Sequence, residues 1–224
     1  MKSIFPAVIA LVLVSFAAGR TREGASVRMH GAVVIGHSGH STGMVELSVM
    51  DSTIHLDIRY ATIHNFMGRA MYDTGRAFLR RAAAEALERV QKHLVSRGLG
   101  LMIFDAYRPW RVTKAFWDAT PPEKRKFVAN PSKGSVHNRG CAVDLTLYDR
   151  KTGKELPMPS GYDEFSGRAA PSYPGGTSKE RANRALLRSV MEREGFEVNS
   201  GEWWHYDYRK WKTFDVLDIP FNEL

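Results

Sequence analysis

The chain of 224 residues contains a single cysteine, Cys141, and this limits how its fold can be stabilised. No disulfide can form within the chain, and a structural zinc site built from several cysteines is also excluded. Stability must therefore come from apolar packing, with a bound metal ion as the other candidate source. Because 43% of the residues are apolar and 11% aromatic, a substantial core can be buried. We expect one globular domain over residues 24–224.

The first 18 residues have the order of a secretory signal peptide. Lys2 precedes an apolar run from Ile4 to Ala18 that is short for a membrane span, and small residues lie before Gly19. Cleavage between Ala17 and Gly19 gives a periplasmic or secreted protein without stable membrane insertion. An uncleaved membrane anchor and a frayed N-terminus are the alternatives.

The formal net charge of +8 falls to +7 if Lys2 leaves with the signal. The basic residues are scattered through the helices rather than grouped, which favours a solvated basic surface over a binding patch for anionic envelope polymers. The sequence contains no nucleic-acid-binding motif, so we expect no nucleic-acid partner.

Periodicity in the first half predicts strands and an amphipathic helix. Between residues 27 and 60 the chain has short extended segments, among them the alternating run from Ile54 to Ile58. From Arg76 to Arg97 the apolar residues recur at helical spacing, with Glu85/Arg89 and Glu88/Lys92 as surface pairs and Gly98 as the stop. A buried strand then covers Leu101 to Phe104.

The second half continues without repeats or domain linkers. Thr120, Pro121 and Glu123 predict the start of a helix, Ala142–Tyr148 a strand, residues 151–177 a long functional loop, Thr177–Gly195 a capped helix, and Trp203–Tyr208 a strand. Because helices and strands do not alternate regularly, we predict an α+β fold in one domain, with a mainly antiparallel central sheet and flanking helices.

Three segments could carry chemistry: residues 105–109, 135–144 and 201–205. His137, Asp144 and His205 supply two imidazoles and one carboxylate, which is the ligand count of a catalytic zinc site with a fourth position open to water. Glu202 is placed to act as a general base that is not itself a ligand. Taken singly, each histidine is more often a surface or core residue than a ligand.

The spacing of Glu202 and His205 imposes a structural condition. A regular strand sends residues three apart to opposite faces, so both can reach one site only if the strand bends or bulges at Trp203 and Trp204.

These segments resemble the D-alanyl-D-alanine dipeptidases of the vancomycin-resistance type, which are related to zinc D,D-carboxypeptidases and to the hedgehog signalling domain. Residues 135–144 match the family pattern Ser-x-His-x-x-Gly-x-Ala-x-Asp, and residues 202–205 match Glu-x-x-His. Residues 59–62, 105–109, 137–148, 158–163 and 202–206 look like family segments in family order. The resemblance covers roughly Asp57 to Tyr208 and implies a hedgehog/D,D-peptidase-like fold.

The resemblance also implies residue roles. His137, Asp144 and His205 would bind one Zn²⁺ per chain, Glu202 would act as general base and then general acid, and Arg108 would stabilise the tetrahedral oxyanion. The substrate is expected to be a small D,D-dipeptide. Its ammonium would meet Asp163 and Tyr60, its carboxylate would meet Ser135, and Phe116 would form a pocket wall.

Two features depart from the family, and two other functions stay open. Cys141 stands where a small residue such as Ser is expected, and many family members lack an export signal. An exported enzyme fits wall recycling or nutrition better than antibiotic resistance. The alternative functions are a zinc D,D-carboxypeptidase or endopeptidase acting on longer peptidoglycan stem peptides, and a non-catalytic zinc-stabilised binding module. Retention of Glu202 and Arg108, neither of which is needed to hold a metal, favours catalysis.

Overall fold

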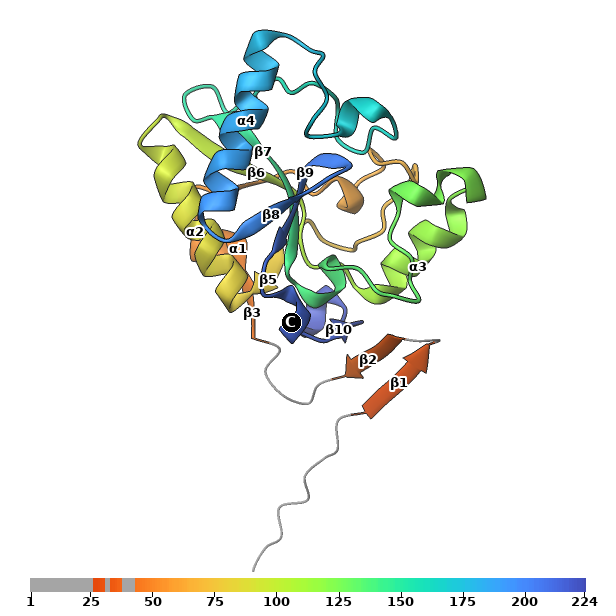
Figure 1. The fold of residues 1–224 in the computed structure, drawn as a ribbon. Coiled ribbons are helices and arrows are strands. Elements are labelled where there is room, and N and C mark those ends of the chain that lie inside the picture. The colour runs from red at the N-terminus through yellow and green to blue at the C-terminus, as the bar shows by residue number, and fades with distance from the viewer. Residues whose placement is uncertain (1–25, 31–32, 38–42) are drawn as a thin grey trace, which may run out of the picture.

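The computed structural model describes residues 26–30, 33–37 and 43–224 (Figure 1). The expected signal peptide, residues 1–18, lies outside the described residues, as do residues 24–25, 31–32 and 38–42 of the expected catalytic domain. The helices are α1 (Leu47–Met50), α2 (Arg81–Val95), α3 (Trp110–Ala119) and α4 (Ser178–Arg193). Short 3₁₀ turns span Arg59–Ala61, Pro122–Phe127, His137–Arg139, Gly167–Ala169, Trp211–Thr213 and Phe221–Glu223.

The central sheet has five strands in the order β4-β6-β7-β9-β8. These are β4 (His55–Leu56), β6 (Leu99–Asp105), β7 (Ala142–Asp149), β9 (Glu202–Tyr208) and β8 (Phe196–Asn199). Only β4 and β6 run parallel; the other three pairs are antiparallel. The predicted α+β fold with a mainly antiparallel central sheet is therefore confirmed.

The register of this sheet brings functional side chains into one row. Asp144 on β7 lies opposite His205 on β9 and, on its other side, opposite Asp105 at the end of β6. Three polar residues from separate parts of the sequence thus meet across neighbouring strands.

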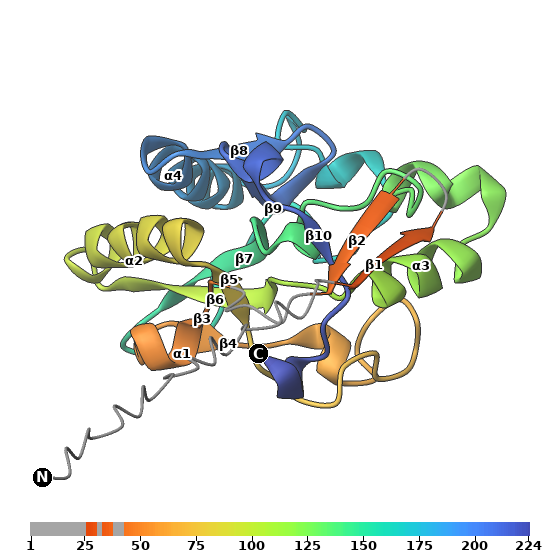
Figure 2. The same ribbon diagram turned by 90° about the horizontal axis from the view of Figure 1, so that it is seen from below.

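Helices α2 and α4 lie side by side against one face of the central sheet, and α3 lies beyond its opposite side (Figures 1 and 2). As the alternation on β7 predicts, Val143, Leu145 and Leu147 are fully buried and belong to the main core with Leu187 and Met191 of α4. This core holds the strand that carries Asp144 in place.

Two smaller sheets complete the fold. One pairs β3 (Met44–Glu46) with β5 (Phe78–Arg80), and the other has the order β1-β2-β10, formed by Ser26–His30, Val33–His37 and Val216–Leu217. Within the described part of the chain, every helix is too short or too polar to span a lipid bilayer.

Four expectations about local structure need correction. The helix predicted from Arg76 begins at Arg81, because Phe78–Arg80 pairs with β3 instead. The strand predicted over Ile54–Ile58 is reduced to His55–Leu56, and a 3₁₀ turn follows at Arg59. The predicted helix after Thr120 is a 3₁₀ turn without a side-chain cap, because the Thr120 hydroxyl donates back to the Phe116 carbonyl and closes α3. The fourth is the expected Glu85/Arg89 pair on α2, which is replaced by a pair between Arg89 and Glu194.

Surface and capping predictions for α2 and α4 can be checked directly. Lys92 pairs with Glu88 at 2.8 Å as expected, whereas Arg89 binds Glu194 at 2.7 Å rather than the carboxylate of Glu85. Thr177 and Glu180 form the predicted capping box at the start of α4.

Candidate active site

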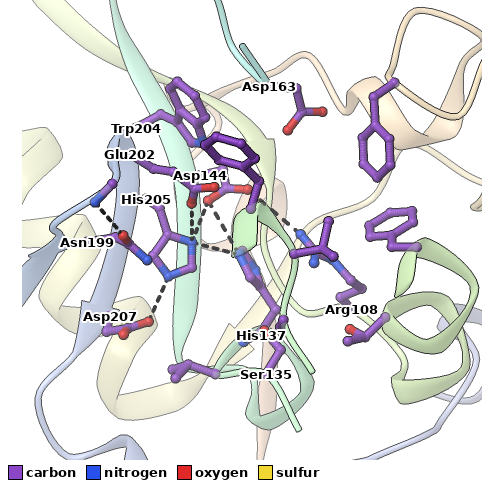
Figure 3. A pocket seen from close by; sticks show the side chains of 18 of the residues that line it. Arg108, Ser135, His137, Asp144, Asp163, Asn199, Glu202, Trp204, His205 and Asp207 are labelled. Atoms are coloured by element: carbon purple, nitrogen blue, oxygen red, sulfur yellow. Dashed lines mark hydrogen bonds and ion pairs between the residues drawn. The ribbon is translucent and has the colours of Figure 1, made fainter. Parts of the chain in front are cut away.

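Three predicted metal ligands converge from different elements. His137 begins the 3₁₀ turn that precedes β7, Asp144 lies on β7, and His205 lies on the neighbouring strand β9. Gly140 ends the turn with a φ of 66°, a conformation that glycine adopts without strain, and so lets the chain enter β7 directly. Figure 3 shows the three side chains pointing toward a common centre.

The inner atoms of these side chains form a compact triangle. Asp144 Oδ1 lies 3.0 Å from His205 Nδ1 and 3.3 Å from His137 Nε2, and the two ring nitrogens are 3.2 Å apart. Tetrahedral ligands about 2.0–2.1 Å from a zinc ion are separated from one another by about 3.3 Å. The triangle therefore has the dimensions of one face of a zinc coordination tetrahedron.

The outer hydrogen bonds assign the histidine tautomers. His137 Nδ1 lies 2.6 Å from the Ala106 carbonyl oxygen, and His205 Nε2 lies 2.9 Å from Asp207 Oδ1, so each outer nitrogen donates its proton there. The inner nitrogens then present lone pairs, which explains why the buried Asp144 Oδ1 has no hydrogen-bond donor despite its close neighbours. Three acceptors facing one another in this way repel, and a cation between them removes the repulsion.

Charge at this centre also suits a cation. Burial alone would raise the pKa of Asp144, but without a metal the protonated forms of His137 and His205 hold that pKa well below its usual range. A metal cation would replace those inner protons and favour the carboxylate in the same way. Asp144 is therefore an anionic ligand.

The second oxygen of Asp144 has its own partners. Tyr162, from the loop between β7 and α4, donates its hydroxyl to Asp144 Oδ2 at 2.9 Å, and Arg108 Nη2 lies 3.8 Å from the same oxygen. Oδ1 is thereby left as the oxygen that faces the two histidines.

Glu202 reaches the site through the strand irregularity that its spacing required. Adjacent residues Val198 and Asn199 on β8 pair with Tyr206 and Glu202 on β9, so three residues of β9 bulge out between the two pairs. The expected bulge at Trp203 and Trp204 is confirmed. A Glu202 carboxylate oxygen then lies 3.8 Å from His205 Nδ1. Burial raises the pKa of Glu202 above its ordinary value.

Arg108 is fixed on the other side of the centre. Its Nε and Nη2 donate to Asp105 Oδ2 at 2.9 and 2.7 Å, and Asp105 Oδ1 accepts from the Tyr72 hydroxyl at 2.8 Å. Burial opposes the charge of Arg108, but the Asp105 carboxylate raises its pKa well above the ordinary value. The guanidinium is therefore a fixed positive charge with its plane near the ring of Phe116, 4.8 Å from the ring centre.

A pocket of about 330 Å³ opens over the centre and contains all nine predicted site residues among its lining. Asp163 lies at one end of the pocket (Figure 3), and the Tyr60 hydroxyl donates to Asp163 Oδ2 at 2.9 Å. Burial, reinforced by the charge of Asp144, raises the pKa of Asp163 to about 8. Asp163 is also the one described non-glycine residue with a positive φ, 57°. A carboxyl group held in this way is suited to meet a cation.

The remaining predicted pocket residues, Ser135 and Phe116, line the pocket and also contact neighbouring parts of the fold. Ser135 Oγ accepts from the His137 backbone N–H at 3.2 Å, which helps to shape the turn that carries His137. Phe116 lies on α3 with its ring centre 4.6 Å from that of Tyr60.

Several site residues were not predicted. Asp207 could have been found, because residues two apart on a strand share a face and Asp207 follows His205 by two. Tyr162 and the stacked pair Phe127 and Phe165, with ring centres 5.2 Å apart at the pocket wall, depend on loop conformations that no local pattern indicates. Cys141 is fully buried, and burial raises the pKa of its thiol to about 12, so it fills space in the core and is not one of the converging ligands.

Residues 40–217 match the sequence model of the peptidase M15 family, described as D-Ala-D-Ala dipeptidase. The chain is similar to D-alanyl-D-alanine dipeptidases from Escherichia coli K12, with 34% identity over 81% of this chain and 93% of that protein, and from Enterococcus faecium, with 36% identity over 74% and 92%. A Streptomyces coelicolor protein of the same name is 35% identical over 75% of this chain and 93% of its own length.

Among solved structures, the chain is similar to the LD-carboxypeptidase LdcB, with 24% identity and a TM-score of 0.41, covering 61% of this chain and 63% of that chain. It is also similar to the vancomycin-resistance D,D-dipeptidase VanXYg in complex with a D-Ala-D-Ala phosphinate analogue, with 20% identity, a TM-score of 0.40 and coverage of 61% and 53%. The chain thus spans less than two thirds of either solved structure. The family resemblance expected from the sequence motifs is confirmed by the family match and the curated relatives: the chain belongs to the D-Ala-D-Ala dipeptidase family of M15 metallopeptidases.

Proposed function

We propose that this protein hydrolyses the dipeptide D-Ala-D-Ala to two molecules of D-alanine, with one Zn²⁺ held by His137, Asp144 and His205. The observation that carries the proposal is the triangle of inner acceptor atoms, 3.0–3.3 Å apart, beneath a pocket that also contains Glu202 and Arg108. Relatives named D-alanyl-D-alanine dipeptidase, matched over more than nine tenths of their length, support the choice of substrate.

The His-Asp-His set suits zinc, because nitrogen and carboxylate ligands in a tetrahedral arrangement leave a fourth position open. When bound, zinc lowers the pKa of a water molecule to about 7 and polarises the scissile carbonyl. Asp207 and the Ala106 carbonyl hold the two imidazoles in the tautomer and orientation that this requires.

Glu202 has the position and the pKa of a general base. It lies beside the centre without being one of the three converging ligands, and burial raises its pKa toward the range in which a carboxylate accepts a proton efficiently near neutrality. The proton that it takes from the attacking water can then be delivered to the leaving amine nitrogen.

Arg108 supplies fixed positive charge on the side of the centre opposite Glu202. Because Asp105 and Tyr72 hold the guanidinium before substrate arrives, little reorganisation is needed when negative charge develops on the carbonyl oxygen. Arg108 is therefore assigned to oxyanion stabilisation.

Asp163 and Tyr60 are assigned to the substrate ammonium. The raised pKa of Asp163 reflects a carboxyl group in poor solvation, and an ammonium ion placed against it favours its charged form. A longer peptide would place a neutral amide there and leave the buried acid unpaired, which favours a free dipeptide over a peptidoglycan stem.

Ser135 and Phe116 complete the proposed subsites. Ser135 uses its oxygen as an acceptor for His137 N–H, and its hydroxyl proton has no acceptor among the described residues, so it can donate to the substrate carboxylate. Phe116 packs against Tyr60 and forms an apolar wall. We further propose that residues 1–18 direct export, so that the enzyme acts on dipeptide released from the cell wall.

The test is a D-alanine release assay with purified protein, before and after removal of metal by a chelator and after addition of zinc. We expect release from D-Ala-D-Ala that is lost on chelation and restored by zinc. A pentapeptide stem serves as the competing substrate in parallel reactions. Preference for the stem would indicate a carboxypeptidase, and inactivity toward both substrates with zinc bound would indicate a binding module.

A further inference from the structure

The loop between β7 and α4 contributes a hydroxyl to the metal centre from outside the two motifs that carry the expected metal ligands and Glu202. Tyr162 donates to Asp144 Oδ2 at 2.9 Å, while Asp144 Oδ1 is buried and receives no hydrogen bond from any described group. The two oxygens of one carboxylate are thus in different environments. Rotation of the carboxylate would exchange them and would break the bond to Tyr162.

The tyrosine is itself held firmly over the strand that carries Asp144. Its ring centre lies 4.7 Å from that of Phe104 on β6 and 5.5 Å from that of Trp204 on β9, the strands on either side of β7. Near the same loop position, Ser160 accepts a hydrogen bond from Trp203 Nε1 at 2.9 Å. The loop is therefore attached to the sheet, and the hydroxyl has a fixed direction.

We propose that Tyr162 is a positioning residue that holds Asp144 as a one-oxygen ligand by occupying its second oxygen. Because Asp163 follows directly, one loop segment would fix both the metal centre and the ammonium subsite. The left-handed backbone of Asp163 turns the chain so that Tyr162 contacts Asp144 while Asp163 contacts Tyr60. The link to the ammonium subsite rests on the proposed function; the effect on metal binding does not.

The test is the zinc affinity of Tyr162→Phe, measured by competition with a chromogenic chelator on folded protein. The variant keeps the ring between Phe104 and Trp204 and removes only the hydroxyl. Loss of a hydrogen bond to a ligating carboxylate typically weakens metal binding by about 10–100-fold, and we expect a loss in this range.

The matched control is Tyr206→Phe. The Tyr206 hydroxyl is buried next to His205 in sequence but has no hydrogen-bond partner among the described residues, so its removal should leave zinc affinity unchanged. An unchanged affinity in Tyr162→Phe, or an equal loss in both variants, would overturn the proposal.

Kinetics at saturating zinc provide a second readout. Because Asp163 and Tyr60 remain in place, Tyr162→Phe should keep the wild-type KM for dipeptide once zinc is saturating. A raised KM with unchanged zinc affinity would assign Tyr162 to the substrate subsite instead and overturn the positioning role. Failure of the wild-type protein to hydrolyse dipeptide would contradict the proposed function, yet the zinc affinities of the two variants would still test Tyr162.

Discussion

We expect the Asp163 carboxyl group to lower the stability of the folded protein and to strengthen substrate binding. The substitution Asp163→Asn tests both effects. Burial raises the pKa of Asp163 from 3.8 to about 8, so near pH 7 the unfolded chain releases a proton that the folded protein keeps. At about 1.4 kcal/mol per pKa unit, the destabilisation at pH 7 has an upper limit of about 4 kcal/mol. Because Asp163 is only partly buried, solvent screens part of this destabilisation. We expect Asp163→Asn to be more stable than the wild type by about 1–3 kcal/mol at pH 7.

The substitution is well matched to the site. Asparagine tolerates the left-handed backbone conformation at φ 57°, and its carbonyl oxygen can still accept from the Tyr60 hydroxyl. The assay is urea unfolding of metal-free protein from pH 4 to pH 9. Exposed Asp73, which forms no ion pair with described residues, supplies the control substitution Asp73→Asn.

The sign of the pH dependence is fixed by the direction of the shift. At pH 4, close to the ordinary pKa of 3.8, Asp163 is protonated in the folded protein and only partly ionised in the unfolded chain, so the variant and the wild type should differ little in stability. Between pH 4 and about 8 the wild type should lose stability relative to Asp163→Asn, and above pH 8 the difference should be constant. Bound zinc should reduce the difference, because a nearby dication favours the carboxylate.

Activity should change in the opposite direction. Loss of a charged partner for the ammonium costs about 1.5–3 kcal/mol, which corresponds to a fall of about 10–100-fold in kcat/KM for D-Ala-D-Ala. A variant that is less stable than wild type at pH 7, or a stability difference that does not vary with pH, would refute the view that Asp163 is a poorly solvated carboxyl group.

Three further substitutions test other parts of the site and fold. Glu202→Gln should lower turnover by about 10²–10⁴-fold while bound zinc, measured by metal analysis, stays at one per chain; normal turnover would remove Glu202 as the base. Arg108→Lys loses the two-pronged contact with Asp105 and should lower kcat by about 10²–10³-fold, and a change confined to KM would argue against oxyanion stabilisation. Thr177→Ala removes the cap of α4 and should lower the free energy of unfolding by about 1 kcal/mol in urea titrations without changing kcat; an unchanged stability would show that the Glu180 half of the capping box is sufficient.

The sequence predicted those parts of the fold that local patterns determine. Alternation placed Asp144 on one face of a strand with Val143 and Leu145 on the other, and the capping signals at Thr177 located α4. Because Glu202 and His205 are three residues apart, both could reach one site only across a bulge in the strand. The shift in register between β8 and β9 shows this bulge. Each of these depends on a few neighbouring residues.

Other features depended on contacts between distant segments. Phe78–Arg80 has the spacing of a helix but forms a strand because β3 is available to pair with it. Thr120 has the identity of a helix cap but bonds back to Phe116. Tyr162 lies in a family-like segment, but its contact with Asp144 has no local signal, because Asp144 precedes it by 18 residues and meets it only when the loop folds back over the sheet.

The same loop links the metal centre to the proposed ammonium subsite. Tyr162 and Asp163 are consecutive, yet Tyr162 contacts the proposed metal ligand Asp144, Asp163 contacts Tyr60 in the proposed ammonium subsite, and the backbone is left-handed at Asp163. A poorly solvated acid and a strained backbone each destabilise the folded protein, and both are located where substrate should bind. Substitutions that relieve them should therefore stabilise the protein and impair dipeptide binding together.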